Sequence, residues 1–235
     1  MHTPPSQPAK IPLRERKYLK TRIRLAQALR THLERVSLEE LAVRDLCDEV
    51  ELSEATFFNY FPKKSDLLAY LSQLWSLELA WFGQQSLSQA ESGLAVVQAV
   101  FERAAQQFQA APGTTGELIA WQARMRTRQA PQPLSPNERR LAYPDHAGIE
   151  ILEDQGIEQI LVKSVQRATE RGELPPNAHL PTIMVSLISV FYGVPLALRL
   201  NNPAGIGAMY RQQLVLVWAG VRQLAGRRVE TTTGN

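Results

Sequence analysis

The chain has few of the residues on which catalytic and metal sites depend. Its 235 residues include a single cysteine, Cys47, and four histidines. One cysteine cannot form an intramolecular disulfide or meet the ligand spacing of a cysteine-based zinc site, and it fits a reducing compartment. No histidine has an evident nucleophile partner, and the chain has no glycine-rich phosphate loop. These absences argue against an enzyme, a metal centre and a resident cofactor.

Long apolar runs are also scarce. The most apolar uncharged stretch, Ile183 to Leu198, is shorter than the ~20 residues that cross a bilayer, and it contains Pro195. This length favours a helix buried inside a protein over a membrane span. The first twenty residues lack the apolar core of a secretory signal, and residues 1–13 are expected to form a disordered arm. We therefore expect a cytoplasmic protein without a membrane partner.

Helical periodicity runs along almost the whole chain, and no segment has a convincing strand pattern. Ile23, Ala26, Leu29 and Leu33 recur at three- and four-residue steps, which predicts an amphipathic helix over residues 14–35. Between residues 10 and 35, nine lysines and arginines face only two glutamates. Such a basic face permits an anionic partner.

A crowded aromatic stretch follows this helix. A short apolar pattern predicts a second helix over residues 43–49, and Ser53 is placed to cap a third helix. On that third helix, Phe57 and Phe61 lie one turn apart and face inward, which leaves a polar strip on the outer side. Two short helices braced by a longer one indicate a helix-turn-helix, whose second helix can enter the DNA major groove.

The stretch VRDLCDEVELSEATFFNYFPKKSDLL resembles the N-terminal DNA-binding domain of the tetracycline-repressor (TetR) family of bacterial transcription regulators, over about residues 20–79. The resemblance implies an all-α chain with a helix-turn-helix domain at 14–79, a helical effector-binding and dimerisation domain at 80–228, and a disordered tail at 229–235. It also implies a set of DNA contacts, in which Tyr60 and Lys64 hold phosphates. The full set is Thr21, Arg22, Arg44, Ser53, Ala55, Thr56, Phe58, Asn59, Tyr60 and Lys64.

Three residues depart from the family pattern. Glu51 takes the place of a turn glycine, while Ala42 and Lys63 take the places of helix-capping residues. Residues 36–64 also carry seven acidic side chains against three basic ones, so any DNA affinity should fall steeply with salt. A helical adaptor or ligand-binding protein that has lost DNA binding is the alternative.

In the remaining two thirds of the chain, the apolar periodicity predicts helices near residues 91–110, 115–129, 146–172, 180–200 and 205–225. The resemblance implies a small-molecule effector and a homodimer formed by the last two helices. Large apolar residues that could line a pocket, or simply form core, are Trp75, Trp81, Phe101, Trp121 and Met125. The candidate dimer residues are Leu187, Phe191, Tyr210, Leu214 and Trp218.

His146, Glu150 and Asp154 recur every four residues and would share one helix face. That spacing could hold a metal, but a solvated first helical turn is the favoured interpretation. Together the patterns predict a homodimeric transcription regulator, most simply a repressor that a small molecule releases from a near-palindromic operator.

Overall fold

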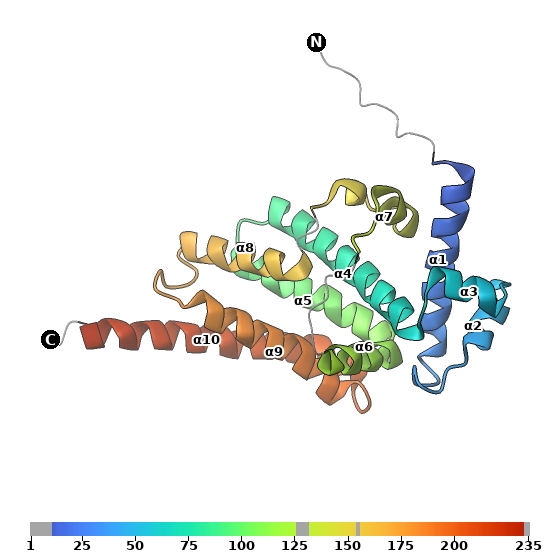
Figure 1. The fold of residues 1–235 in the computed structure, drawn as a ribbon. Helices are drawn as coiled ribbons and strands as arrows, with labels where there is room; N and C mark the ends of the chain where they lie inside the picture. Colours follow the sequence, from blue (N-terminus) through green and yellow to red (C-terminus); the bar gives the residue numbers. More distant parts are fainter. Residues whose placement is uncertain (1–10, 126–131, 154–155, 233–235) are drawn as a thin grey trace, which may run out of the picture.

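The computed structural model describes residues 11–125, 132–153 and 156–232. Over these residues the chain forms ten α-helices, two short 3-10 helices and no strand, so the all-α prediction is confirmed (Figure 1). The predicted N-terminal arm falls mostly outside the described residues, and the first helix begins at Leu13. Figure 1 shows three N-terminal helices at one end of the molecule and the longer helices packed together beside them.

The N-terminal unit consists of α1 (Leu13–His32), α2 (Val43–Val50), α3 (Glu54–Tyr60) and the first turns of α4 (Lys64–Gln89). Its core contains Phe57 and Phe61, which are 0% and 3% exposed, as their spacing predicts. Leu25 and Leu29 of α1 and Leu46 of α2 belong to the same buried cluster. The three predicted helices therefore exist and pack against one another.

The turn between α2 and α3 closes in a left-handed conformation at a residue that is not glycine. Glu51 has φ 59° and ψ 51°, and it has the only positive φ among the non-glycine residues described. The Leu52 N–H donates to the Cys47 carbonyl at 2.9 Å and the Glu51 N–H to the Asp48 carbonyl at 3.4 Å. These two bonds form a Schellman motif, which usually places glycine where Glu51 stands.

Helix α4 connects two hydrophobic cores. Its residues up to Leu77, among them Leu67 and Leu71, belong to the N-terminal core, and Leu79 and Leu87 further along belong to a second core. The second core also contains residues of α5 (Gly93–Ala110), α8 (Gly156–Glu170), α9 (Leu180–Leu198) and α10 (Ile206–Thr232). The proposed domain boundary after residue 79 thus lies inside a continuous helix.

The predicted helix over residues 146–172 is confirmed as α8 over residues 156–170 but is wrong over residues 146–153. The chain instead forms a short 3-10 helix, η1 (Ile149–Ile151), and then α8. Gly148 and Gly156 both have positive φ, at 79° and 61°, and so interrupt the helical conformation. The helix expected at 115–129 is α6 (Pro112–Arg124), which begins earlier because Pro112 suits its first turn.

The helices predicted from the sequence do not include α7 (Pro136–Ala142), which begins at the end of a proline-rich segment. Ser135 accepts a hydrogen bond from the Glu138 N–H at 3.2 Å, and Pro136 occupies the first turn. A serine followed by proline and then by glutamate at the third helical position is a helix-start signal. The sequence contained this signal.

The last two helices pack against each other, with the short 3-10 helix η2 (Pro203–Gly205) between them. Helix α9 is the one described helix long and apolar enough to cross a membrane, but Ile183 and Leu187 are buried in the second core. It is therefore a core helix. Helix α10 continues to Thr232, through the first residues of the segment expected as a tail, because no glycine or proline interrupts residues 227–232.

We expect Glu51→Gly to raise the free energy of unfolding by about 1 kcal/mol, because glycine adopts the left-handed conformation without a Cβ clash. Urea denaturation would measure the change. The matched control is Asp45→Gly within α2, which should lower stability by about 1 kcal/mol. Destabilisation by both substitutions would show that the turn carries no strain.

Candidate nucleic-acid interface and effector cavity

Helix α3 presents a short polar strip. Ser53 caps the helix by accepting the Thr56 N–H at 3.2 Å, and the two hydroxyl oxygens lie 2.7 Å apart. Ala55 and Asn59 are exposed on the same helix, and Phe58 is 46% exposed. Exposure of this strip is what base reading in a groove requires. The individual DNA contacts remain predictions.

Tyr60, the predicted phosphate ligand, is held by a neighbour that the sequence did not reveal. Its ring stacks on Tyr18 of α1, with centroids 4.9 Å apart and planes at 26°. Lys17 and Lys20, which flank Tyr18, are exposed on α1, and Arg44 on α2 keeps 78% of its side chain exposed beside Asp48. Cations from α1 and α2 therefore border the strip on α3. Thr21 is half-buried, and its contact also remains a prediction.

Lys64 has a structural position instead of the predicted phosphate position. Its Nζ donates to the carbonyls of Leu38, Glu39 and Leu41 at 2.7, 3.1 and 2.7 Å. An ammonium group has three N–H donors, so these three bonds use all of them. Lys64 thus ties the start of α4 to the segment that precedes α2.

Arg22 also turns inward, away from the role that the resemblance implies. Its Nη1 lies 2.9 Å from Oε1 of Glu138 on α7. Its guanidinium lies 4.3 Å from the ring centroid of Tyr70 and 5.3 Å from that of Phe61. Only 22% of the side chain is exposed. The ion pair with Glu138 and the rings of Tyr70 and Phe61 hold this arginine. Its partner Glu138 is buried and belongs to α7, far from α1 in the sequence.

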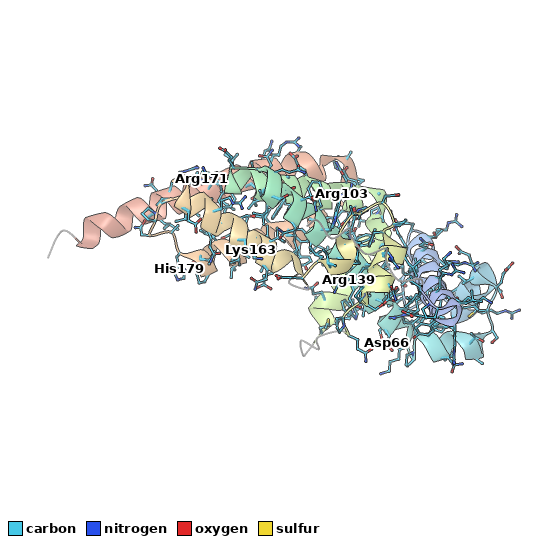
Figure 2. The ribbon with its side chains drawn as sticks, turned by 90° about the horizontal axis from the view of Figure 1, so that it is seen from above. Asp66, Arg103, Arg139, Lys163, Arg171 and His179 are labelled. Atoms are coloured by element: carbon cyan, nitrogen blue, oxygen red, sulfur yellow. The ribbon has the colours of Figure 1, made fainter. Side chains whose placement is uncertain are left out.

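The two capping departures have different outcomes. Ala42 gives α2 no side-chain cap, as predicted. At the start of α4, the Asp66 carboxylate accepts the Lys63 N–H at 3.0 Å, which is the bond that the third helical residue contributes to a capping box. Figure 2 shows Asp66 at the end of the molecule that holds the N-terminal helices.

A cavity of about 600 Å³ lies beside α4, with walls from α6, α7, α8 and α9. Trp121, Phe191 and Tyr192 supply aromatic surface, while Ser72 and Gln73 of α4 supply polar atoms. A volume of this size with mixed lining suits a small organic molecule. Ser76 and Gln122 also line an adjoining smaller hollow.

The predicted pocket residues fall in several places. Trp121 lines the main cavity and Trp75 lines the adjoining hollow. Phe101 is 0% exposed and belongs to the second core, so its interpretation as a pocket residue is wrong. Trp81 donates through Nε1 to the Ala147 carbonyl at 3.0 Å, and Met125 is exposed at the end of α6; neither lines the cavity. Periodicity cannot distinguish these fates, because core and pocket residues share the same apolar stripe.

The candidate dimer residues face the interior of their own chain. Four of them, Leu187, Tyr210, Leu214 and Trp218, are at most 7% exposed, and Phe191 packs beside them. The exposed apolar side chains lie on other faces of the same helices. They are Val185, Ile188 and Leu196 on α9 and Val215, Leu216 and Leu224 on α10. The candidate residues therefore lie on the inner faces of α9 and α10, and the dimer itself remains a prediction.

The acidic face proposed around His146 does not exist as one helix face. His146 lies before Gly148, Glu150 lies in η1, and Asp154 lies outside the described residues. The His146 ring packs on Trp81 with centroids 4.3 Å apart, and its Nε2 lies 3.9 Å from Glu78. Over the described parts of the chain, no three histidine, cysteine or acidic side chains gather as metal ligands would.

Comparison with known proteins gives no match to a family model and none to a curated protein. Solved structures do match. FadR of Thermus thermophilus, described as a TetR family transcriptional repressor in complex with lauroyl-CoA, has a TM-score of 0.57 at 16% identity, over 83% of this chain and 92% of that chain. A TetR transcription regulator from Haloarcula marismortui gives 0.59 at 17% identity, over 86% and 98%.

RolR, solved in complex with resorcinol, gives a TM-score of 0.55 at 14% identity, over 91% of this chain and 96% of that chain. The chain therefore has the fold of the TetR family of transcription regulators. The family is not one of enzymes. The resemblance identified in the first third of the sequence thus extends, as a fold, over most of the chain.

We expect Lys64→Met to lower the free energy of unfolding by about 2 kcal/mol, because three backbone carbonyls lose a charged donor. Lys63→Met is the matched control, since the Lys63 side chain is exposed and should change stability by less than about 0.5 kcal/mol. Thermal denaturation of both variants would measure the difference. Equal stability of the two variants would contradict the structural role of Lys64.

Proposed function

We propose that the protein is a cytoplasmic, homodimeric DNA-binding repressor that a small molecule releases from a near-palindromic operator. The observation that carries the proposal is the exposed polar strip of α3, mounted on a braced helix-turn-helix in a chain with the TetR fold. In this proposal, Ser53, Thr56 and Asn59 read base edges, and Tyr60 with the cations of α1 holds phosphates. Base contacts then specify sequence, and phosphate contacts fix the register.

The effector in this proposal occupies the cavity beside α4. Two structural neighbours were solved with lauroyl-CoA and resorcinol, which are organic ligands of very different size. The 600 Å³ cavity and its aromatic lining support a small organic effector for this chain as well. Such an effector would lower operator affinity by binding more tightly to a conformation in which the recognition helices do not fit the DNA.

The dimer in this proposal forms through the exposed apolar face of α9 and α10. Val185, Val215 and Leu216 are each about two thirds exposed, and they lie on helices that pack side by side. Exposed apolar side chains gathered on two adjacent helices suit an interface. A two-fold dimer would present two copies of α3 to successive major grooves.

Selection of bound fragments from a random DNA pool tests the DNA-binding function. We expect the purified protein to enrich a short inverted repeat at low salt, and we expect Tyr60→Ala to weaken binding by about 1–3 kcal/mol through loss of a phosphate contact and of the Tyr18 stack. Fluorescence anisotropy on the enriched sequence would measure the loss. Asn59→Ala should instead relax the preference at particular base pairs.

Glu91→Gln is the control in these measurements, since Glu91 is exposed and lies before α5, away from the helix-turn-helix. Its binding should equal that of the native protein. Failure of a folded, dimeric protein to enrich any sequence would support the helical adaptor instead.

Light scattering after size exclusion tests the dimer. We expect Leu216→Asp to give a monomer, because a dimer would have to bury an unpaired carboxylate at the centre of its apolar face. The matched control is Ile151→Asp, which changes an 80% exposed apolar residue on η1 and should leave the dimer intact. A dimer that persists in Leu216→Asp would place the interface elsewhere.

A further inference from the structure

The segment formed by Leu134, the cap Ser135 and helix α7 lines the cavity and also contacts the N-terminal helix α1. Leu134 and Arg139 line the cavity beside α4. Arg139 also holds the segment together, because its guanidinium donates to the carbonyls of Leu134 and Leu152. Figure 2 labels Arg139 close to the N-terminal helices, and α7 contacts α1 directly. The cavity wall is thus also a contact surface for the DNA-binding unit.

Glu138, next to Arg139 in the sequence, forms the contact with α1. It is 2% exposed; its Oε1 lies 2.9 Å from Arg22 Nη1 in an ion pair and accepts a hydrogen bond from the Tyr70 hydroxyl at 2.8 Å. Asn137 adds a second bond, since its Nδ2 donates to Glu15 Oε1 at 2.8 Å. Helix α7 therefore contacts α1 at two of its side chains, Glu15 and Arg22, which lie about two turns apart on α1.

The Arg22–Glu138–Tyr70 cluster resists partial displacement. Burial, together with the neighbouring Glu138 carboxylate, raises the pKa of Tyr70, so its hydroxyl remains a donor. Separating Glu138 from Arg22 would leave a buried carboxylate without its counter-charge, which is strongly unfavourable. When α7 moves, the cluster must therefore either carry α1 along or break as a unit.

We propose that α7 couples the cavity to the DNA-binding helices through the Arg22–Glu138–Tyr70 cluster. A molecule that presses on Leu134 or Arg139 shifts α7, and Glu138 transmits the shift to α1. Because α1 packs against α2 and carries the Tyr18 ring that stacks on Tyr60, its displacement changes how α3 is presented. This coupling rests on the proposed function only in assigning the cavity to an effector.

A second connection between the cavity and α1 defines the competing route. The Glu34 carboxylate, just after α1, accepts the N–H groups of Gly113 and Thr114 at 2.9 Å each, at the start of α6. Helix α6 carries Trp121, which lines the cavity. The test must therefore separate transmission through Glu138 from transmission through Glu34.

A tethered probe fills the cavity without knowledge of the effector. Ser76 is exposed and lines the cavity, so Ser76→Cys can be coupled to phenethyl methanethiosulfonate to form a mixed disulfide. Cys47 is 2% exposed, and burial, with Glu54 and Asp48 nearby, raises its pKa, so it should not react. Mass spectrometry would confirm a single adduct, and dithiothreitol would remove it.

Hydrogen–deuterium exchange of the α1 amides is the readout. We expect the tethered probe to speed their exchange by at least about threefold in Ser76→Cys, and to have no such effect when Glu138→Gln is added, because the uncharged amide no longer holds Arg22. Glu91→Gln is the matched control and should preserve the threefold response. Tyr70→Phe, which keeps the ring packing and removes one bond to Glu138, serves as a second variant should Glu138→Gln fold poorly.

An equal response with and without Glu138→Gln would overturn the proposal, as would loss of the response in Glu34→Gln alone, which would place the coupling in α6. The exchange measurement needs no DNA, so it decides the coupling even if no operator is found. Operator affinity measured on the same proteins then tests the regulatory consequence, with a loss of affinity on tethering expected only where Glu138 is intact.

Discussion

The continuous helix α4 is the constraint on which the rest of the structure depends. Leu67 and Leu71 fix one end of this helix in the N-terminal core, and Leu79 and Leu87 fix the other end in the second core. The helix is continuous over 26 residues, so it spans about 39 Å at 1.5 Å per residue. The cavity opens along its middle, so the same helix lines the cavity and joins both cores.

Polar side chains add further connections between the N-terminal helices and the rest of the chain. Lys64 satisfies three carbonyls before α2, Glu34 caps α6, and Glu138 binds Arg22. Each of these bonds joins residues more than twenty positions apart in the chain, and two of them join the N-terminal helices to elements that wall the cavity. Apolar packing brings the two halves together, and these directional contacts set how α1 lies against α6 and α7.

Much of the fold was predictable from local pattern. The aromatic spacing of Phe57 and Phe61, the Ser53 cap and the strained turn at Glu51 were each predicted and each confirmed, because helical periodicity and capping act over a few residues. Arg22 and Lys64 were assigned to DNA by resemblance, but both bind groups inside the chain. The Leu214 and Trp218 stripe was assigned to a dimer, yet it is core. Nothing local distinguishes an apolar stripe that faces its own chain from one that faces a partner.

The sequence by itself determined the helical class, the helix-turn-helix and the polar strip on α3, since these follow from spacing within single helices. Only the tertiary structure decided which cations are exposed, which apolar side chains of α9 and α10 are exposed, and that a wall of the cavity also contacts α1. The physical reason is that charge pairing and burial depend on what lies across from a side chain. For Glu138 and Arg22, the partner is more than a hundred residues away along the chain.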